Sequence, residues 1–290
     1  MRDMASYLQD RDDQTPHTDD WLSAVRRVRT THLQRCKDLG HRFSMLTSYD
    51  ALTAEIFDAA GIEVLLIGDS AGNTVFGYES TLPVTLDELI PLTRAVSRAA
   101  QRALVIVDLP FGTYEESPAQ AVASAVRLMK EGEAHAVKME GGAYYAEHVR
   151  AMVQAGIPVM AHVGFTPQST NALGGFRVQG RAEAASRLIE DATALEAAGA
   201  FAVLAEMSAE DAVRAMDEAL TVPTVGIGAG RSTTGQVLVW QDMAGLTTGK
   251  TPRFVKKYAD VRSVITDAAS SYRKDVLDGS FPAEAHVFRE

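Results

Sequence analysis

The stretch VLLIGDSAG, Val64–Gly72, decides how the rest of the chain is interpreted. Four consecutive apolar residues run into a glycine that is followed by Asp69 and Ser70. A short continuous apolar run is typical of a buried parallel strand, and the abrupt change to small and acidic residues marks the carboxyl end of that strand. The stretch therefore predicts a strand over residues 64–67, with Asp69 and Ser70 directly beyond it.

The same pattern returns twice farther along the chain. The stretch LVIVDLP, Leu104–Pro110, carries an apolar run into Asp108, and HAVKMEGG, His135–Gly142, carries one into Lys138 and Glu140. Carboxylates at the ends of different strands can converge if those strands lie side by side in parallel. We therefore predict that the three carboxylates meet at one edge of a sheet and together hold one divalent cation.

Apolar runs alternate with helix-like stretches along the whole chain. Eight alternations, without a Pro/Gly linker or a shift in composition, are typical of an α/β fold, a single (β/α)8 TIM barrel of about 250 residues. A doubly wound open sheet is the alternative, but it would show a glycine fingerprint after its first strand, where this chain has TSYDA. Strands are predicted over residues 42–47, 64–67, 104–107, 134–139, 158–162, 201–204, 224–227 and 237–240, and helices over 51–60, 86–100, 118–131, 143–155, 181–198, 209–219 and 262–277.

The beginning of the chain differs from the rest. Residues 1–18 are polar and aperiodic, and we predict that they form a disordered lead-in. Residues 19–38 are expected to form a charged helix that ends before Gly40, so that the barrel carries an N-terminal helical extension. Residues 19–290 are then expected to form one barrel domain.

Composition narrows the class of partner. The chain has 290 residues, 46% of them hydrophobic, and a formal net charge of -10. Such an acidic chain without a Lys/Arg cluster is a poor match for a nucleic acid, which leaves a small-molecule substrate as the expected partner. The single cysteine, Cys36, excludes an internal disulfide and is interpreted as a spectator thiol. Nothing resembles a signal peptide or a membrane-spanning run, so a cytoplasmic location is expected.

Polar side chains at the predicted strand ends suggest a hard cation. Oxygen ligands without cysteine or a histidine pair favour Mg²⁺, with Mn²⁺ as an alternative. Lys138 and Glu140 are two residues apart and should point to the same side of one strand. His162 also ends a strand, and it is interpreted as a hydrogen-bonding or substrate-contacting group, or as a rim histidine with no special role, in preference to a ligand.

Glu206 ends the sixth predicted strand, apart from the other acids. Its apolar neighbours should raise its pKa by desolvation, which suits a general base. The alternative is an acid that stabilises the N-terminus of the next helix. The stretch GIGAGRS, residues 226–232, is either an anion-binding loop or a tight turn. Two long loops, 72–84 and 164–180, are expected to cover the mouth of the barrel.

Several of these stretches carry a family resemblance. In order and spacing, GDSAGNTVFGYEST, VDLPFGTYE, AVKMEGG, VMAHVGFTPQS, GGFRVQGR and TVGIGAG resemble the ketopantoate hydroxymethyltransferase (3-methyl-2-oxobutanoate hydroxymethyltransferase) family. The resemblance extends from about Arg29 to Phe288. One departure is the segment MSAEDAV after Glu206, where family members more often have a proline.

The resemblance implies a specific activity. Members of this family are TIM barrels, usually homodecamers, that bind one Mg²⁺ per subunit. They transfer a hydroxymethyl group from 5,10-methylenetetrahydrofolate to 3-methyl-2-oxobutanoate in pantothenate biosynthesis. Carried over by position, the resemblance implies a metal site formed by Asp69, Asp108 and Glu140, oxo-acid contacts from Asp69, Ser70, Asp108 and Lys138, and a catalytic base at Glu206.

Two rival interpretations remain. A Mg²⁺-dependent oxo-acid lyase or aldolase of the phosphoenolpyruvate/pyruvate barrel type would also use a cation and an oxo acid. Such enzymes typically carry a catalytic cysteine in a lid, whereas Cys36 lies far from every predicted strand end. A barrel kept only as an oligomeric scaffold would be expected to have lost a key acid, and all of them are present.

Overall fold

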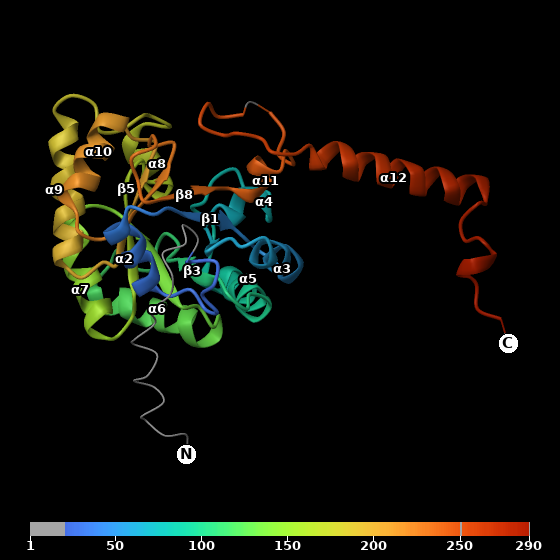
Figure 1. Cartoon of the computed structure of the whole chain (residues 1–290), viewed down its shortest axis with the longest axis horizontal. Helices are drawn as coiled ribbons and strands as arrows, with labels where there is room; N and C mark the ends of the chain where they lie inside the picture. The colour runs from blue at the N-terminus through green and yellow to red at the C-terminus, as the bar shows by residue number, and fades with distance from the viewer. Residues whose placement is uncertain (1–20, 250, 290) are drawn as a thin grey trace, which may run out of the picture.

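The computed structural model describes residues 21–249 and 251–289. Eight parallel strands close into a barrel in the order β1 to β8, which confirms the predicted fold (Figure 1). The predicted lead-in at residues 1–18 lies outside the described residues. The strands are β1 Phe43–Thr47, β2 Val64–Ile67, β3 Leu104–Asp108, β4 Ala136–Glu140, β5 Val159–Gly164, β6 Ala202–Glu206, β7 Thr224–Ile227 and β8 Gly235–Leu238.

Helices surround the barrel and begin where the sequence provides N-terminal capping groups. The Ser117 hydroxyl accepts a hydrogen bond from the Gln120 amide at the start of α6, and Thr85 and Glu88 form a reciprocal capping box in α5. The longer helices around the strands are α3 Ala51–Ala59, α5 Leu86–Ala99, α6 Pro118–Glu131, α7 Ala146–Gln154, α9 Ala184–Ala197 and α10 Glu210–Ala219. Three short helices are α4 Ala71–Thr74, α8 Thr170–Leu173 and α11 Trp240–Met243. None of the described helices is both long and apolar enough to cross a membrane.

The strand register brings the rim residues to one level. Asp108 on β3 pairs with Lys138 on β4, Glu140 with His162 on β5, and Gly164 with Glu206 on β6. The buried residues inside the barrel are alternate residues of each strand, for example Ile106, Met160 and Leu204. Because side chains alternate along a strand, Asp108, His162 and Glu206 continue the same inward rows, as do Lys138 and Glu140 above Ala136.

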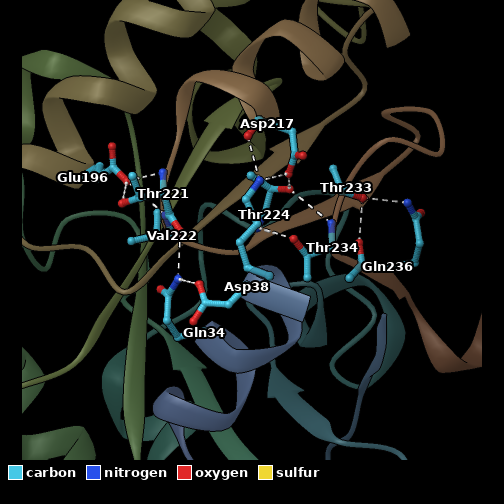
Figure 2. A network of polar contacts seen from close by, with 12 residues as sticks. Gln34, Asp38, Glu196, Asp217, Thr221, Val222, Thr224, Thr233, Thr234 and Gln236 are labelled. Atoms are coloured by element: carbon cyan, nitrogen blue, oxygen red, sulfur yellow. Dashed lines mark hydrogen bonds and ion pairs between the residues drawn. The ribbon is translucent and has the colours of Figure 1, made fainter. Parts of the chain in front are cut away.

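The N-terminal helix closes the opposite end of the barrel. This helix, α2, spans Thr30–Leu39, so the predicted extension is confirmed, but residues 21–29 are turns and irregular backbone, and residues 19 and 20 lie outside the described residues. Its buried Leu33 and Cys36 belong to the same core as the inward-facing strand residues. Figure 2 shows how its polar side meets the segment that precedes β7, where Gln34 donates to the Thr221 carbonyl oxygen at 2.8 Å. Glu196 of α9 accepts from the Thr221 amide at 2.7 Å. The predicted site residues Asp69, Asp108, Glu140 and Glu206 lie at the other, carboxyl-terminal end of the strands.

Two predicted elements need correction. Strand β8 was expected over residues 237–240, but it spans Gly235–Leu238. Trp240 instead begins α11, and its amide donates to the Thr47 hydroxyl at 3.0 Å. The predicted closing helix exists as α12, Val261–Asp278, but it contains no buried residue and projects away from the barrel (Figure 1). Helical periodicity predicts that a helix forms but does not say which surface it packs against.

Candidate active site at the carboxyl-terminal rim

One cavity at the rim collects all the predicted site residues. Its volume is about 490 Å³, which lies in the range of pockets for drug-sized ligands and exceeds what a five-carbon oxo acid needs. Both long loops contribute to the wall, through Glu79 and Thr81 from the first and Phe176 from the second. The predicted residues that line the cavity are Asp69, Ser70, Asp108, Lys138, Glu140, His162 and Glu206.

A buried ion pair lies on the floor of this cavity. Lys138 Nζ is 2.8 Å from Asp108 Oδ1, and both side chains are almost completely buried. The other oxygen of Asp108 accepts a hydrogen bond from the Asp69 amide at 2.9 Å. Burial alone would lower the pKa of Lys138, but the carboxylates of Asp108, Glu140 and Asp69 outweigh it and raise that pKa. Lys138 is therefore an ammonium, already paired with one acid.

Negative charge remains in excess around this pair. Burial, followed by repulsion from Glu140 and Asp108, raises the pKa of Asp69 well above its usual value. Burial is also the main cause of the raised pKa of Glu140. Among the lining residues that the structure describes, Lys138 is the single lysine or arginine. A cluster of this kind is stabilised by a further cation, because each added positive charge lowers the cost of keeping the carboxylates ionised.

The carboxylates of Asp69, Asp108 and Glu140 are the right type of ligand for a hard cation, but in this structure they do not surround a common point. Asp69, Asp108 and Glu140 present buried carboxylate oxygens, the type of ligand that Mg²⁺ prefers, although Asp108 Oδ1 is already paired with Lys138. Within residues 21–249 and 251–289, however, no three His, Cys, Asp or Glu side chains are arranged as a ready metal-binding group. Rotation of these side chains, with displacement of Lys138 from Asp108, would be needed to complete a coordination shell.

Glu206 faces the cavity from the end of β6. Burial, followed by the charge of Glu140, raises the pKa of Glu206 to about 8. Its Oε2 lies 3.4 Å from Nε2 of His162, whose own pKa is lowered by burial and by Lys138, so the imidazole is neutral. A carboxylate with a raised pKa in a buried cavity can accept a proton from a weak carbon acid.

The backbone around Glu206 is tightly constrained. Met207 has a φ of 40°, an uncommon value for a residue with a side chain. On the neighbouring strand, a Cβ at Gly164 would come within 2.5 Å of the Glu206 carbonyl oxygen and 2.4 Å of the Ser208 hydroxyl. Glycine at position 164 therefore allows β5 and β6 to approach each other closely just beside Glu206.

Ser70 is held by a residue that the sequence did not single out. Its hydroxyl lies 2.8 Å from the hydroxyl of Tyr49, a fully buried side chain. A Cβ at Gly68 would lie 2.6 Å from the Ser70 oxygen, so the glycine before Asp69 makes room for this contact. Gln168 and Tyr114 were also missed, although Gln168 donates to Asp69 Oδ2 at 2.9 Å.

The stretch GIGAGRS forms a turn. Gly228 and Gly230 have φ values of 60° and 79° and pack against the side chains of Phe254 and Glu210. The chain passes from β7 to β8 through residues 228–234 without a helix. The structure therefore supports the tight-turn interpretation, because the helix N-terminus on which an anion site would depend is absent from this segment.

Comparisons with known proteins agree with this geometry. The ketopantoate hydroxymethyltransferase family model matches residues 27–284. Proteins named 3-methyl-2-oxobutanoate hydroxymethyltransferase from Paenarthrobacter aurescens and Saccharopolyspora erythraea are 66% and 60% identical to this chain. The matches cover 91% of this chain in both cases, and 88% and 90% of the respective relatives.

Solved structures share the barrel at much lower identity. A phosphonopyruvate hydrolase has a TM-score of 0.59 at 14% identity, covering 90% of this chain and 92% of its own. A 2,3-dimethylmalate lyase has a TM-score of 0.55 at 17% identity, covering 89% and 91%. These structures establish the fold alone, whereas the family model and the relatives also establish the family. The chain belongs to the ketopantoate hydroxymethyltransferase family.

Proposed function

We propose that this protein transfers a hydroxymethyl group from 5,10-methylenetetrahydrofolate to 3-methyl-2-oxobutanoate, giving ketopantoate for pantothenate biosynthesis. The observation that carries the proposal is the set of charged side chains that face one cavity at the rim. This set contains a carboxylate with a raised pKa, Glu206, together with the ion pair between Lys138 and Asp108. Relatives that bear the name of this activity and match nine-tenths of the chain support the same assignment.

The metal site is proposed to consist of Asp69, Asp108 and Glu140, holding one Mg²⁺ per subunit. When bound, Mg²⁺ would draw electron density from the keto oxygen and so acidify the hydrogen on C3 of the oxo acid. The three side chains are almost completely buried, so their repulsion is poorly screened until a cation is present.

The oxo acid is proposed to contact Asp69, Ser70, Asp108 and Lys138. Lys138 would neutralise the carboxylate of the substrate when its ammonium turns away from Asp108. The Ser70 hydroxyl, already oriented by Tyr49 at 2.8 Å, would donate to a substrate oxygen. The protein thus supplies charge and orientation, while the folate supplies the one-carbon unit.

Glu206 is proposed to be the general base. Its carboxylate would remove the proton from C3, and the resulting enolate carbon would form a bond to the one-carbon unit. Overall, both carbon–nitrogen bonds of that unit break and water supplies the hydroxyl group. The proton taken by Glu206 and the second proton of water go to the two folate nitrogens, so that tetrahydrofolate leaves. A base whose pKa is near the working pH combines a useful fraction of ionised form with proton affinity. Neutral His162, 3.4 Å from Glu206 Oε2, would help to hold that carboxylate in place.

The protein is proposed to work in the cytoplasm as a homo-oligomer, with a decamer as the family expectation. The feature that supports self-association is α12, which projects from the barrel. Its apolar side chains are largely exposed to solvent, including Val264 (68%), Tyr272 (61%) and Leu277 (68%). A contact with another subunit would remove this apolar surface from water.

A lyase of the phosphoenolpyruvate/pyruvate type is less well supported. The cysteine typical of such enzymes belongs in a lid over the rim, whereas Cys36 is fully buried in α2 at the opposite end of the barrel. A direct test separates the two activities. With 3-methyl-2-oxobutanoate and Mg²⁺ in D₂O, we expect NMR to show exchange of the C3 proton, and added methylenetetrahydrofolate to yield ketopantoate. No exchange in either condition would refute the transferase proposal.

A further inference from the structure

Gln168 is a buried polar residue to which the proposed mechanism gives no role. It lies in the 3₁₀ helix η3, Pro167–Ser169, at the start of the second long loop, and its exposure is 5%. Its side-chain Nε2 donates to Asp69 Oδ2 at 2.9 Å and to the Leu109 carbonyl oxygen at 3.0 Å. Its backbone amide donates to Glu140 Oε2 at 3.0 Å. One loop residue thus contacts two of the three proposed metal ligands.

The orientation of the Gln168 amide is fixed by its surroundings. Its Oε1 accepts a hydrogen bond of 2.6 Å from the Tyr114 hydroxyl, which also lies 3.1 Å from the carbonyl oxygen of Glu140. Turning the amide over would direct Oε1 at two acceptors, Asp69 Oδ2 and the Leu109 carbonyl oxygen, with no proton between them. The two acceptors therefore select the arrangement in which the NH₂ group faces Asp69, and the Tyr114 hydroxyl completes it by donating to Oε1.

The chemistry of an amide suits this position. A glutamate at position 168 would add negative charge beside Asp69 and remove the donor. A neutral amide instead satisfies one lone pair of the Asp69 carboxylate and leaves the other oxygen free to face the cavity. Hydrogen bonds of this kind orient a ligating carboxylate, and loss of such partners typically lowers metal affinity 10–100-fold.

We infer that Gln168, locked by the Tyr114 hydroxyl, is a positioning residue that orients Asp69 and Glu140 toward the bound cation. The inference rests on the proposed function, because it assigns a role toward the same Mg²⁺ site. It also links the second long loop to that site, since Gln168 reaches the carboxylates from both its backbone and its side chain. Metal binding and order of the loop are then coupled.

The test measures the Mg²⁺ affinity of the full-length protein by titration calorimetry without substrates. Binding that is lost in Asp69→Asn is assigned to this site, because Asp69 is a proposed ligand. Gln168→Met keeps the length of the side chain but removes the amide, and we expect it to weaken Mg²⁺ binding about 10-fold or more. Tyr114→Phe removes only the hydroxyl, and we expect a smaller loss, about 3-fold to 10-fold. Because the hydroxyl acts through Gln168, the double variant should bind no more weakly than Gln168→Met alone.

Tyr145→Phe is the matched control, because Tyr145 packs edge-on against Tyr114 with ring centroids 5.6 Å apart. It should leave Mg²⁺ affinity within about 2-fold of wild type, since its role is packing. A second measurement follows trypsin cleavage after two exposed arginines, Arg177 in the second long loop and Arg181 directly after it. Mg²⁺ should slow cleavage in the wild-type protein and lose that effect in Gln168→Met, a difference that reduced overall stability alone would not produce.

Each outcome has a definite meaning. Mg²⁺ affinity unchanged in both Gln168→Met and Tyr114→Phe would refute the positioning role while leaving the proposed function intact. Fully additive losses in the double variant would refute the claim that the Tyr114 hydroxyl acts through Gln168. A wild-type protein whose Mg²⁺ binding is absent, or is insensitive to Asp69→Asn, would refute the proposed metal site and this inference together.

Discussion

Replacing Glu206 by glutamine should change stability in a way that depends on pH. The native state raises the pKa of this carboxyl to about 8, so it holds the proton more tightly than the unfolded chain does. The group therefore opposes folding once the pH exceeds the ordinary glutamate pKa, and the unfavourable contribution grows until the pH passes 8. Glutamine is close in shape and never ionises, so the variant escapes this cost.

The size of the effect follows from the pKa. The pKa of Glu206 is about 8 in the native state and has an ordinary glutamate value in the unfolded chain. From this difference, the free energy of unfolding of Glu206→Gln should exceed that of wild type by about 1 kcal/mol at pH 5, about 3 kcal/mol at pH 7 and about 5 kcal/mol at pH 9. These values apply without a divalent cation. Added Mg²⁺ should narrow the gap, because neutralising the neighbouring carboxylates lowers the pKa of Glu206.

Urea unfolding in EDTA at pH 5, 7 and 9, at one protein concentration, measures this gap. Glu79→Gln is the control, since Glu79 is an exposed acid on the wall of the same cavity and should change stability by less than about 0.5 kcal/mol. In the activity assay, Glu206→Gln should bind the oxo acid but lose C3 proton exchange by about 10²-fold or more. A stability gap that stays flat or shrinks as pH rises would refute the electrostatic reasoning, and near-normal exchange would remove Glu206 from the base role.

Other perturbations test the remaining parts of the proposal. Mg²⁺ at about 100 times its dissociation constant should stabilise the wild-type protein by about 3 kcal/mol in thermal or urea unfolding, and Asp69→Asn should abolish that gain. Lys138→Met should destabilise the metal-free protein by about 3–5 kcal/mol, because Asp108 would be left as a buried unpaired charge, and calorimetry should show that oxo-acid binding is lost. Removal of residues 261–290 should reduce the size of the assembly in analytical ultracentrifugation, and an unchanged mass would exclude α12 from the subunit contacts.

Much of the barrel could be predicted because local signals and tertiary packing agree. Strands β2 and β7 were predicted with their observed bounds, as was α6, where Ser117 and a proline at the first helical position mark the start. The spacing of Lys138 and Glu140 placed both on one side of β4, and both side chains line the rim cavity. Strand β8 was misplaced because its apolar run continues to Trp240, while the ladder to β1 ends earlier, at Leu238.

The direction of α12 and the role of Gln168 could not be read from the chain. No residue of α12 is buried by the rest of the described chain, so contacts within the chain do not set its direction, whereas its periodicity depends only on its own residues. Gln168 neither titrates nor ends a strand, and its partner Tyr114 lies 54 positions away. The signal that marked the region was the length of its loop, together with the motif GFTPQS.

The ion pair between Lys138 and Asp108 adds a constraint that the sequence interpretation lacked. Lys138 was assigned to the oxo acid and Asp108 to both the oxo acid and the cation, yet in the structure the two side chains form an ion pair at 2.8 Å. An anionic oxo acid entering alone would take Lys138 from Asp108 and face several buried carboxylates without compensation. A cation entering alone at the proposed site would draw Asp108 away from Lys138 and leave the ammonium without its closest carboxylate, beside the cation. Each ligand would remove the electrostatic penalty that the other creates, so we expect the proposed cation and oxo acid to bind cooperatively.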